Sequence, residues 1–545
     1  MASLKCGYCK KFHTANCVAE SVDSVKEKAF YQDEDSEPFD EACFEFDEER
    51  LKEKGDLIEF FADIVMEEFT VKHFCKGDSS LGLHVWEEGR YVQAEERLKA
   101  EIEALGLKAG LKGKVKTHVV NEVIEKLKRR TYFELKEEPM RLAFKNYVLD
   151  WKEFLAGNMD KALIPIEQTK ETPVFHLIPW DLNVELLKNA LNDFNGEDGF
   201  SKVAEEVAPE VVSVFKSWVG DSWVLLFEII GYCLYPAYPF NKAFMLVGDG
   251  NNGKSKFLEL VKKTVGEGNA TGQSLQDLCL YRFAQAELYH KLANIFADIP
   301  NKPIGYAGWF KILTGEDSAS APRKFKSSLY FKNYAKLLFS ANELPEVADM
   351  SEAFWRRWIV VEFPNKFPDN PNFFEETFTK EVIEKIVVLS VLAFANVWFN
   401  RGFSIKKTAQ DFKELWLRKV NSIYAYVKSG VEDGRLTLDK EAETESNELY
   451  EDYRRWAENE DIEAEAKATF TKELERLFGI VKKRTRDDNS LPYVYVGIEL
   501  KEEKETKESS TNCEVCGRKA TTHIVREDGE HWLCGKCVAE WEGNL

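Results

Sequence analysis

The apolar positions in the central part of the chain predict short buried strands that alternate with helices. Apolar runs at residues 244–247, 292–297, 337–339 and 358–361 each have the length of one strand. After the first run, apolar residues recur at helical spacing over residues 257–261. A strand, a turn and a helix therefore open this part of the chain, and we expect an α/β fold.

Upstream of this part, the spacing of aromatic and leucine residues predicts a mostly helical region over residues 51–239. Apolar stretches at residues 223–240 and 386–399 are expected to be buried helices. Glu228 interrupts the first stretch, and the second is too short to span a membrane. We therefore expect no membrane partner.

Downstream, helical patterns at residues 447–456 and 469–478 precede two strand-like runs at residues 481–486 and 493–496. Thr469 is the expected cap of the second helix, which Gly479 ends. Helix, helix and hairpin is the order of a winged-helix domain, which serves either DNA binding or protein docking. Candidate phosphate contacts are Lys472, Lys482, Lys483, Arg484 and Arg486.

The turn after the first strand is rich in glycine and ends on a lysine and a hydroxyl. Its residues are Gly248, Asp249, Gly250, Asn251, Asn252, Gly253, Lys254 and Ser255. Backbone N–H groups of such a loop point at phosphates, the next helix adds partial positive charge, the lysine reaches the outer phosphates and the serine ligates Mg²⁺. The motif predicts binding and hydrolysis of a nucleoside triphosphate, with ATP and Mg²⁺ as cofactors.

An ATPase that does mechanical work also needs an acid that holds Mg²⁺, a polar sensor near the γ-phosphate and a cation that completes the charge cage. Asp298 ends the second strand and is the candidate Mg²⁺ acid, and Asn342 ends the third and fits the sensor. Arg356 and Arg357 precede the fourth strand. One of them could reach the triphosphate of a neighbouring subunit, and the alternative is a surface ion pair.

The charge balance limits how the chain can meet nucleic acid. A net charge of −21 over 545 residues argues against a surface that coats DNA, so any contact is local. Residues 108–130 are basic, and both a DNA contact and a solvated helix face stay open for them. The first residues contain no apolar segment of signal-peptide type, so we expect an intracellular protein.

Seven of the eleven cysteines lie in two clusters with the spacing of zinc ligands. The candidate ligands are Cys6, Cys9, His13 and Cys17 in one cluster and Cys513, Cys516, Cys534 and Cys537 in the other. We expect two structural Zn²⁺ sites, a compact zinc knuckle and a zinc ribbon, that present surfaces for DNA or partners. Thiols without metal are the alternative for both.

Four phrases carry a resemblance to a known family. They are Gly-Asp-Gly-Asn-Asn-Gly-Lys-Ser at residues 248–255, Lys-Ile-Leu-Thr-Gly-Glu-Asp at 311–317, Ser-Ala-Asn-Glu-Leu-Pro at 340–345 and Ala-Phe-Trp-Arg-Arg at 353–357. Over residues 244–367 the chain resembles a superfamily 3 helicase of viruses and plasmids, in particular the poxvirus, phage and plasmid primase-helicase family.

The resemblance implies an AAA+-like P-loop ATPase core in a hexameric ring around a DNA strand. It also implies ATP sites shared between neighbours, with Arg357 as the residue that acts in trans. The segment 320–326 resembles the DNA-gripping hairpin of the papillomavirus initiator helicase. The DNA contacts that this likeness implies are Arg323, Lys324, Phe325 and Lys326.

The water-activating base is open. Many related ATPases end the second strand on two acids, but here Ala297 precedes Asp298 and Ile299 follows it. Glu316 and Asp317 are the candidates that we carry forward.

The multidomain organisation that we expect combines these patterns with the resemblance. It is a zinc knuckle at residues 1–20, an acidic linker at 21–50, a helical collar at 51–240, the ATPase core at 241–405, a helical connector at 406–430, a winged helix at 431–502, a charged linker at 503–512 and a zinc ribbon at 513–545. No primase motif is found, so a separate primase or polymerase is an expected partner.

We expect an ATP-dependent helicase that replicates the DNA of a virus, plasmid or integrated element and translocates on single strands. An origin-binding initiator or DNA-remodelling ATPase is the first alternative. A DNA-binding scaffold in which ATP only locks the oligomer is the second.

Overall fold

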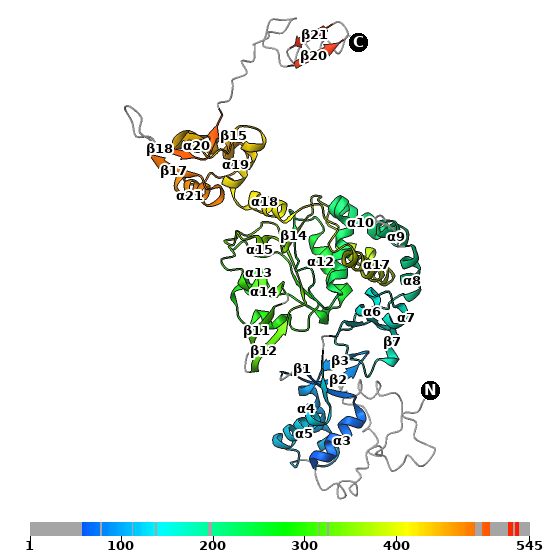
Figure 1. Cartoon of the computed structure of the whole chain (residues 1–545). Helices are drawn as coiled ribbons and strands as arrows, with labels where there is room; N and C mark the ends of the chain where they lie inside the picture. Colours follow the sequence, from blue (N-terminus) through cyan, green and yellow to red (C-terminus); the bar gives the residue numbers. More distant parts are fainter. Residues whose placement is uncertain are drawn as a thin grey trace. The chain divides into compact units, whose positions relative to one another are not determined.

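The computed structural model describes residues 57–76, 79–111, 113–136, 139–193, 199–315, 317–323, 326–484, 493–501, 522–526 and 529–533. The chain divides into two compact units, Met1–Phe412 and Lys413–Leu545, and each is described by itself (Figure 1). The elements are mixed helix and strand in both units, which confirms a multidomain α/β protein.

A five-stranded parallel sheet forms the centre of the first unit. Its strands are β8 (Ala243–Val247), β9 (Ala270–Thr271), β10 (Ala293–Phe296), β13 (Lys336–Ala341) and β14 (Trp358–Glu362). Their spatial order is β14-β8-β13-β10-β9. Every residue of β8 and β13 is buried, as expected for parallel strands that are covered on both faces. The predicted strands are therefore confirmed.

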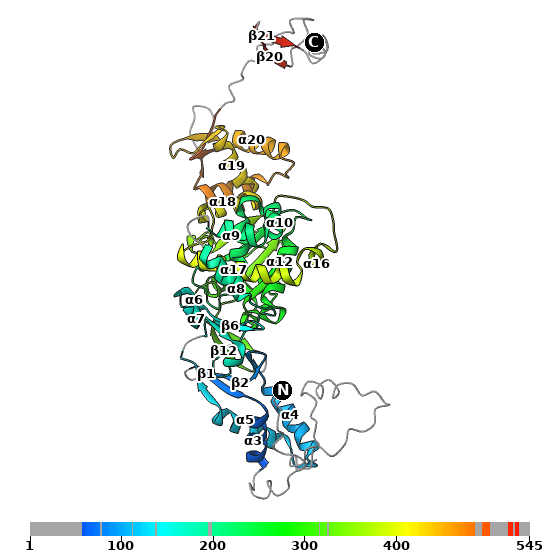
Figure 2. The same cartoon turned by 90° about the vertical axis from the view of Figure 1, so that its right-hand side faces the viewer.

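Helices pack beside this sheet. They are α11 (Trp223–Cys233), α12 (Lys254–Val265) and α17 (Lys380–Phe399), and the last two lie close together in both views (Figures 1 and 2). A Cβ on Gly231 would lie 2.0 Å from Ser390 O, so α11 and α17 meet at backbone distance. By length and composition α17 could cross a membrane, and 67% of its apolar window is buried inside the unit. The predicted buried helix is therefore present, but it begins six residues before residue 386.

The first half of the predicted mostly helical region over residues 51–239 contains the helices α3 (Leu57–Glu68), α4 (Glu95–Lys108) and α5 (Thr117–Arg130), but it also contains two sheets that the sequence did not predict. One sheet there has the order β3-β2-β1-β4 and a second has the order β5-β6-β7. The strands are β1 (Val71–Lys76), β2 (Ser79–Glu87), β3 (Arg90–Gln93), β4 (Tyr132–Glu134), β5 (Arg141–Ala143), β6 (Tyr147–Asp150) and β7 (Leu163–Pro165). Most are so short that their alternation is easily confused with helical spacing. From α8 (Val184–Asp193) to α11 every described element is a helix.

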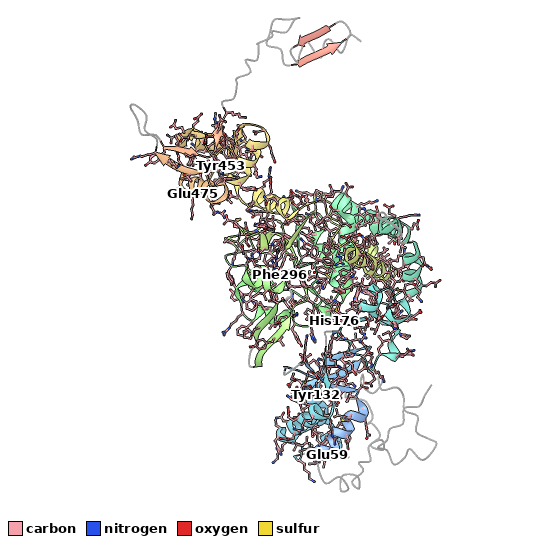
Figure 3. All side chains as sticks on the ribbon, viewed as in Figure 1. Glu59, Tyr132, His176, Phe296, Tyr453 and Glu475 are labelled. Atoms are coloured by element: carbon pink, nitrogen blue, oxygen red, sulfur yellow. The ribbon has the colours of Figure 1, made fainter. Side chains whose placement is uncertain are left out.

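The second unit has the predicted order of helices and hairpin. It contains α19 (Ser422–Glu432), β16 (Glu443–Glu445), α20 (Ser446–Asn459), α21 (Lys467–Phe478), β17 (Val481–Arg484) and β18 (Tyr493–Val496). Tyr426, Tyr453, Phe470 and Tyr495 are fully buried at its centre, and Tyr453 is labelled in Figure 3.

Two details of this unit differ from the sequence prediction. Helix α21 begins at Lys467 after Ala466, so Thr469 lies inside the helix and does not cap it, whereas Gly479 ends it with φ +70. Helix α19, which we assigned to a connector at residues 406–430, packs into the core of this unit through Ile423 and Tyr426. The boundary between the units lies at residues 412–413.

A two-stranded antiparallel hairpin, β20 (Thr522–Arg526) with β21 (Gly529–Leu533), follows near the end of the chain. Several predicted site residues lie outside the described residues: Cys6, Cys9, His13, Cys17, Glu316, Lys324, Phe325, Arg486, Cys513, Cys516, Cys534 and Cys537. In the part of the chain that is described, no group of three or more His, Cys, Asp or Glu side chains could hold a metal ion.

Candidate active site

The glycine-rich loop joins the carboxyl end of β8 to the start of α12. Gly253 has φ +94, and a Cβ there would lie 2.6 Å from Trp218 Nε1. A Cβ on Gly248 would lie 2.4 Å from Phe363 O. Both positions therefore require glycine, because one has left-handed backbone and the other touches main chain. The loop residues Asp249, Gly250 and Asn251 are exposed above this packed base.

Lys254 brings two predicted site residues together. Its side chain is only 3% exposed, and Nζ donates to Asn342 Oδ1 at 3.0 Å and to Asn252 Oδ1 at 3.2 Å. It also donates to Gly248 O and, at 3.1 Å, to Asp249 O. Burial lowers the pKa of Lys254, and the carboxylates of Asp298 and Asp249 act in the opposite direction. The ammonium is therefore placed at the mouth of the loop, beside the predicted sensor.

Asp298 lies at the same edge of the sheet, two residues beyond β10, whose last residue Phe296 is labelled in Figure 3. Its backbone N–H donates to Ser340 Oγ at 3.1 Å, next to the end of β13. Asp298 has φ +49, a left-handed conformation that aspartate tolerates better than most residues. Its side chain is exposed, as is that of Ser255 in the first turn of α12. The Asp298 carboxylate acts on the Lys254 ammonium and Ser255 follows Lys254 in the chain, so both candidate Mg²⁺ ligands lie near Lys254.

A segment after β14 holds the loop from the side, and the sequence reasoning missed it. Asn252, which is buried, donates from Nδ2 to Phe363 O at 3.2 Å, and Phe367 N donates to Asn251 O at 2.7 Å. Lys366 forms an exposed ion pair with Asp249 at 3.2 Å. We call residues 363–367 the strap. The only sequence signal for it was the second asparagine of the glycine-rich motif.

Arg356 and Arg357 lie at the opposite end of the strands from the glycine-rich loop, where β8 and β14 begin. They precede β14, which runs parallel to β8 with Trp358 beside Ala243 and Glu362 beside Val247. At ~3.3 Å per residue the strand separates these arginines from the loop by about 15 Å, further than an arginine side chain extends. Neither residue reaches the loop of its own chain.

The two arginines differ in exposure. Arg357 is 8% exposed and donates from its guanidinium to Ala353 O and, at 3.3 Å, to Lys311 O. Burial and then the Arg356 charge lower the pKa of Arg357. Arg356 is exposed, and Lys242 Nζ donates to its backbone carbonyl at 2.6 Å. The geometry thus favours Arg356, rather than the Arg357 that the resemblance implies, as the residue that can contact another molecule.

The predicted DNA-gripping segment is an antiparallel hairpin of β11 (Ser318–Arg323) and β12 (Lys326–Lys332). Arg323 pairs with Lys326 in the register, and the two residues between them, Lys324 and Phe325, lie outside the described range. The predicted DNA contacts of this segment stay a prediction.

The basic candidates of the second unit fall on different faces. Lys482 pairs with Tyr495 and Arg484 pairs with Tyr493, so both cations lie on the same face of the hairpin. The Tyr495 ring packs against Phe470 from this face. Lys482 Nζ lies 4.8 Å from the centre of the Tyr493 ring, and Arg484 Cζ lies 5.0 Å from it. Lys483 is on the opposite face of the strand, and Lys472 is exposed on α21.

Part of the basic stretch at residues 108–130 forms ion pairs inside the first unit. It contributes α5 (Thr117–Arg130), whose cations face carboxylates of α3 (Leu57–Glu68), α4 (Glu95–Lys108) and α5 itself. The pairs are Lys126 with Glu59, Arg130 with Glu59 and Asp63, and Lys128 with Glu95 and Glu125. This pairing favours the helix-face alternative over a DNA contact.

A family model matches the part of the chain that contains this site. Residues 246–357, which contain the loop, Asp298, Asn342 and both arginines, match the model of a family of unknown function, DUF5906. The match covers a minority of the chain.

Particular relatives follow. The chain is 30% identical over 149 residues to a protein of Acanthamoeba polyphaga mimivirus named "Putative helicase L207/L206". That segment is 26% of this chain and 15% of the viral protein, so the chain spans a small part of its relative.

Among solved structures, the apo C-terminal region of NrS-1 is similar, with a TM-score of 0.38 and 11% identity over 81% of this chain and 99% of that chain. A further structure of the same region, residues 305–718, has a TM-score of 0.36 and 12% identity. A TM-score this low is too weak to carry a conclusion about fold or function.

Proposed function

We propose that this protein is an ATP-dependent DNA helicase of the superfamily 3 class, with an AAA+-like core that works as a hexamer. The observation that carries the proposal is the Lys254 ammonium, bonded to the loop and to Asn342 beside Asp298 at one edge of a parallel sheet. Ligands of open α/β sheets bind at this edge, at the carboxyl ends of the strands. The name of the mimivirus relative supports the helicase class.

The residues present fit a nucleoside triphosphate. The first N–H groups of α12 have no partner within the helix and face the same side as the exposed loop. Lys254 would hold the outer phosphates, Asn342 would contact the γ-phosphate, and Ser255 and Asp298 would hold Mg²⁺. The bound ion would neutralise the phosphate charge that develops during hydrolysis.

The position of the arginines supports a site shared between subunits. Arg356 is exposed at the edge of the sheet that its own loop does not occupy. A head-to-tail ring would present this edge to the loop of the next copy, since heterologous contacts that close generate rings. Each ATP site would then consist of one chain's loop and its neighbour's Arg356.

DNA would be held at two places in this proposal. The β11–β12 hairpin, with Arg323, Lys324, Phe325 and Lys326, would grip a single strand through phosphates and an aromatic ring. The second unit would act as a winged helix that contacts duplex DNA through Lys482 and Arg484 around Tyr493. A separate primase or polymerase, an intracellular setting and two structural Zn²⁺ sites complete the proposal.

A strand-displacement assay on forked DNA tests this function. Unwinding by the full chain that disappears in Lys254→Ala supports the helicase. Hydrolysis of ATP without displacement supports the alternative, an origin-binding initiator or remodelling ATPase. Nucleotide-dependent assembly with neither activity supports a scaffold and contradicts both enzymes.

A further inference from the structure

The site described above has no assigned base for the attacking water. We propose that Glu343 is this general base, an inference that rests on the proposed hydrolysis of ATP. Asp317, the described residue of the two candidates from the sequence, does not suit the role. Its carboxylate interacts electrostatically with Arg357, which lies at the end of the strands away from the loop. The backbone before Asp317 is held at that end as well. Leu313 O, four residues before Asp317, accepts from Asn333 Nδ2 at 2.7 Å, and Asn333 lies just before β13 begins.

The carboxylates at the loop edge can be compared one by one. Asp249 is paired with Lys366 at 3.2 Å, and Glu362, at the end of β14, is paired with Lys407 at 2.7 Å. Asp298 has the position of a metal ligand. Glu343 follows Asn342 directly, and among the described residues no ion pair involves its side chain.

Glu343 is held by an amide, which leaves it the capacity to take a proton. Asn301 Nδ2 donates to Glu343 Oε2 at 2.9 Å. A carboxylate has about four acceptor sites, so the second oxygen stays available for a water molecule. The side chain is exposed, so a captured proton can pass to solvent.

The backbone around this pair is fixed by the neighbouring strand ends. Ile299 N donates to Ser340 O at 2.9 Å, and Ile304 N donates to Glu346 O at 2.8 Å. Ile304 and Val347 also form a parallel bridge. The segment after β10, which carries Asn301, therefore runs beside the segment after β13, which carries Glu343. The acid that is missing beside Asp298 is supplied by the adjacent strand.

The chemical step is a hydrolysis. The water oxygen forms a bond to the γ-phosphorus while the bond between that phosphorus and the β–γ bridging oxygen breaks. One water proton moves to Glu343 Oε1 and then to solvent, and the products are ADP and inorganic phosphate. Lys254 and Asn342 stabilise the charge on the transferred group.

Glu343→Gln in the full chain tests the assignment, with Glu346→Gln as the matched control. Glu346 is also exposed and lies three residues further along the same segment. We expect Glu343→Gln to lower kcat by about 10²–10⁴-fold, the usual contribution of a general base. The Kd for a fluorescent ATP analogue and the melting temperature should stay at the wild-type values. Glu346→Gln should match the wild type in all three measurements.

Asn301→Ala tests the positioning of the base. It should lower kcat less than Glu343→Gln does, because only the hydrogen bond that orients the carboxylate is lost. In the Glu343→Gln background it should lower kcat no further, while the Kd for the ATP analogue and the melting temperature stay at the wild-type values. A purely structural role would lower the melting temperature and would lower kcat equally in both backgrounds.

Three results would overturn the proposal. Hydrolysis that depends on Lys254 but persists in Glu343→Gln removes the base role and leaves the proposed function intact. Loss of analogue binding together with hydrolysis in Glu343→Gln shows a role in holding nucleotide or fold. A wild-type chain without hydrolysis contradicts the proposed function and the base together.

Discussion

Replacing each of the two adjacent arginines should have opposite consequences. Arg357→Ala removes a guanidinium that is 8% exposed and donates to Lys311 O and Ala353 O. Each partly buried carbonyl that loses its donor costs about 1–3 kcal/mol, so the first unit should lose roughly 2–6 kcal/mol of stability before any offset. Relief of the repulsion from Arg356 offsets part of this loss.

Arg356→Ala removes an exposed side chain and should change stability by less than ~0.5 kcal/mol. If Arg356 completes the site of a neighbouring copy, kcat should fall by about 10³-fold or more, the range measured for arginine fingers. Arg356→Lys should recover only part of the activity, because an ammonium lacks the planar fork of the guanidinium.

Thermal unfolding and DNA-stimulated ATPase rates of the same preparations measure both effects. Arg357→Ala should melt about 5 °C lower than the wild type, and Arg356→Ala should melt with the wild type but hydrolyse ATP far more slowly. Full activity in Arg356→Ala, together with a stable but inactive Arg357→Ala, would refute this division of roles. A mixture of Lys254→Ala and Arg356→Ala chains adds a control, since a site shared between copies should regain activity in mixed rings.

Three further predictions concern other parts of the chain. Lys482→Ala should weaken binding of duplex DNA and reduce the magnitude of the slope of log K against log salt concentration by about one. Lys483→Ala makes the same charge change on the other face of the strand and should have a smaller effect. Equal effects of the two substitutions would contradict the assignment of DNA binding to the Lys482 face. Gly231→Ala should destabilise the first unit by about 1–3 kcal/mol, because its Cβ meets the backbone of α17, while Gly305→Ala, which meets nothing within 4 Å, should not. Burial raises the pKa of Glu228 from 4.5 to about 7, so its contribution to stability is fully present below pH ~4.5 and is lost as the pH rises through ~7. The free energy of unfolding in urea should therefore fall for the wild type relative to Glu228→Gln between pH 5 and 8, by up to about 3 kcal/mol. Parallel curves of unfolding free energy against pH for the two proteins would contradict this prediction.

The features that the sequence predicted well are local ones. The apolar runs at β8, β10, β13 and β14 are continuous because both faces of the sheet are covered. The glycine-rich loop is equally local, since its backbone geometry limits which residues are allowed. The order of two helices and a hairpin in the second unit followed from helix periods and the glycine at residue 479.

The features that the sequence did not predict depend on contacts between distant segments. Arg357 is buried because Lys311 and Ala353 present carbonyls to it, and nothing in the adjacent pair of arginines distinguishes it from Arg356. The strap reaches the loop from 111 residues away through Asn252 and Phe363. The two upstream sheets were missed because all of their strands except the nine-residue β2 have only three to six residues, and such short strands carry little periodic signal.

Steady-state ATP hydrolysis by the full chain, compared with Lys254→Ala, tests the central claim most directly. The account predicts Mg²⁺-dependent release of phosphate by the wild type, stimulated by single-stranded DNA and absent in the variant, which should stay folded although it loses the hydrogen bonds of Lys254. Equal rates for the two proteins, or no phosphate release by a folded wild type under any of these conditions, would contradict it.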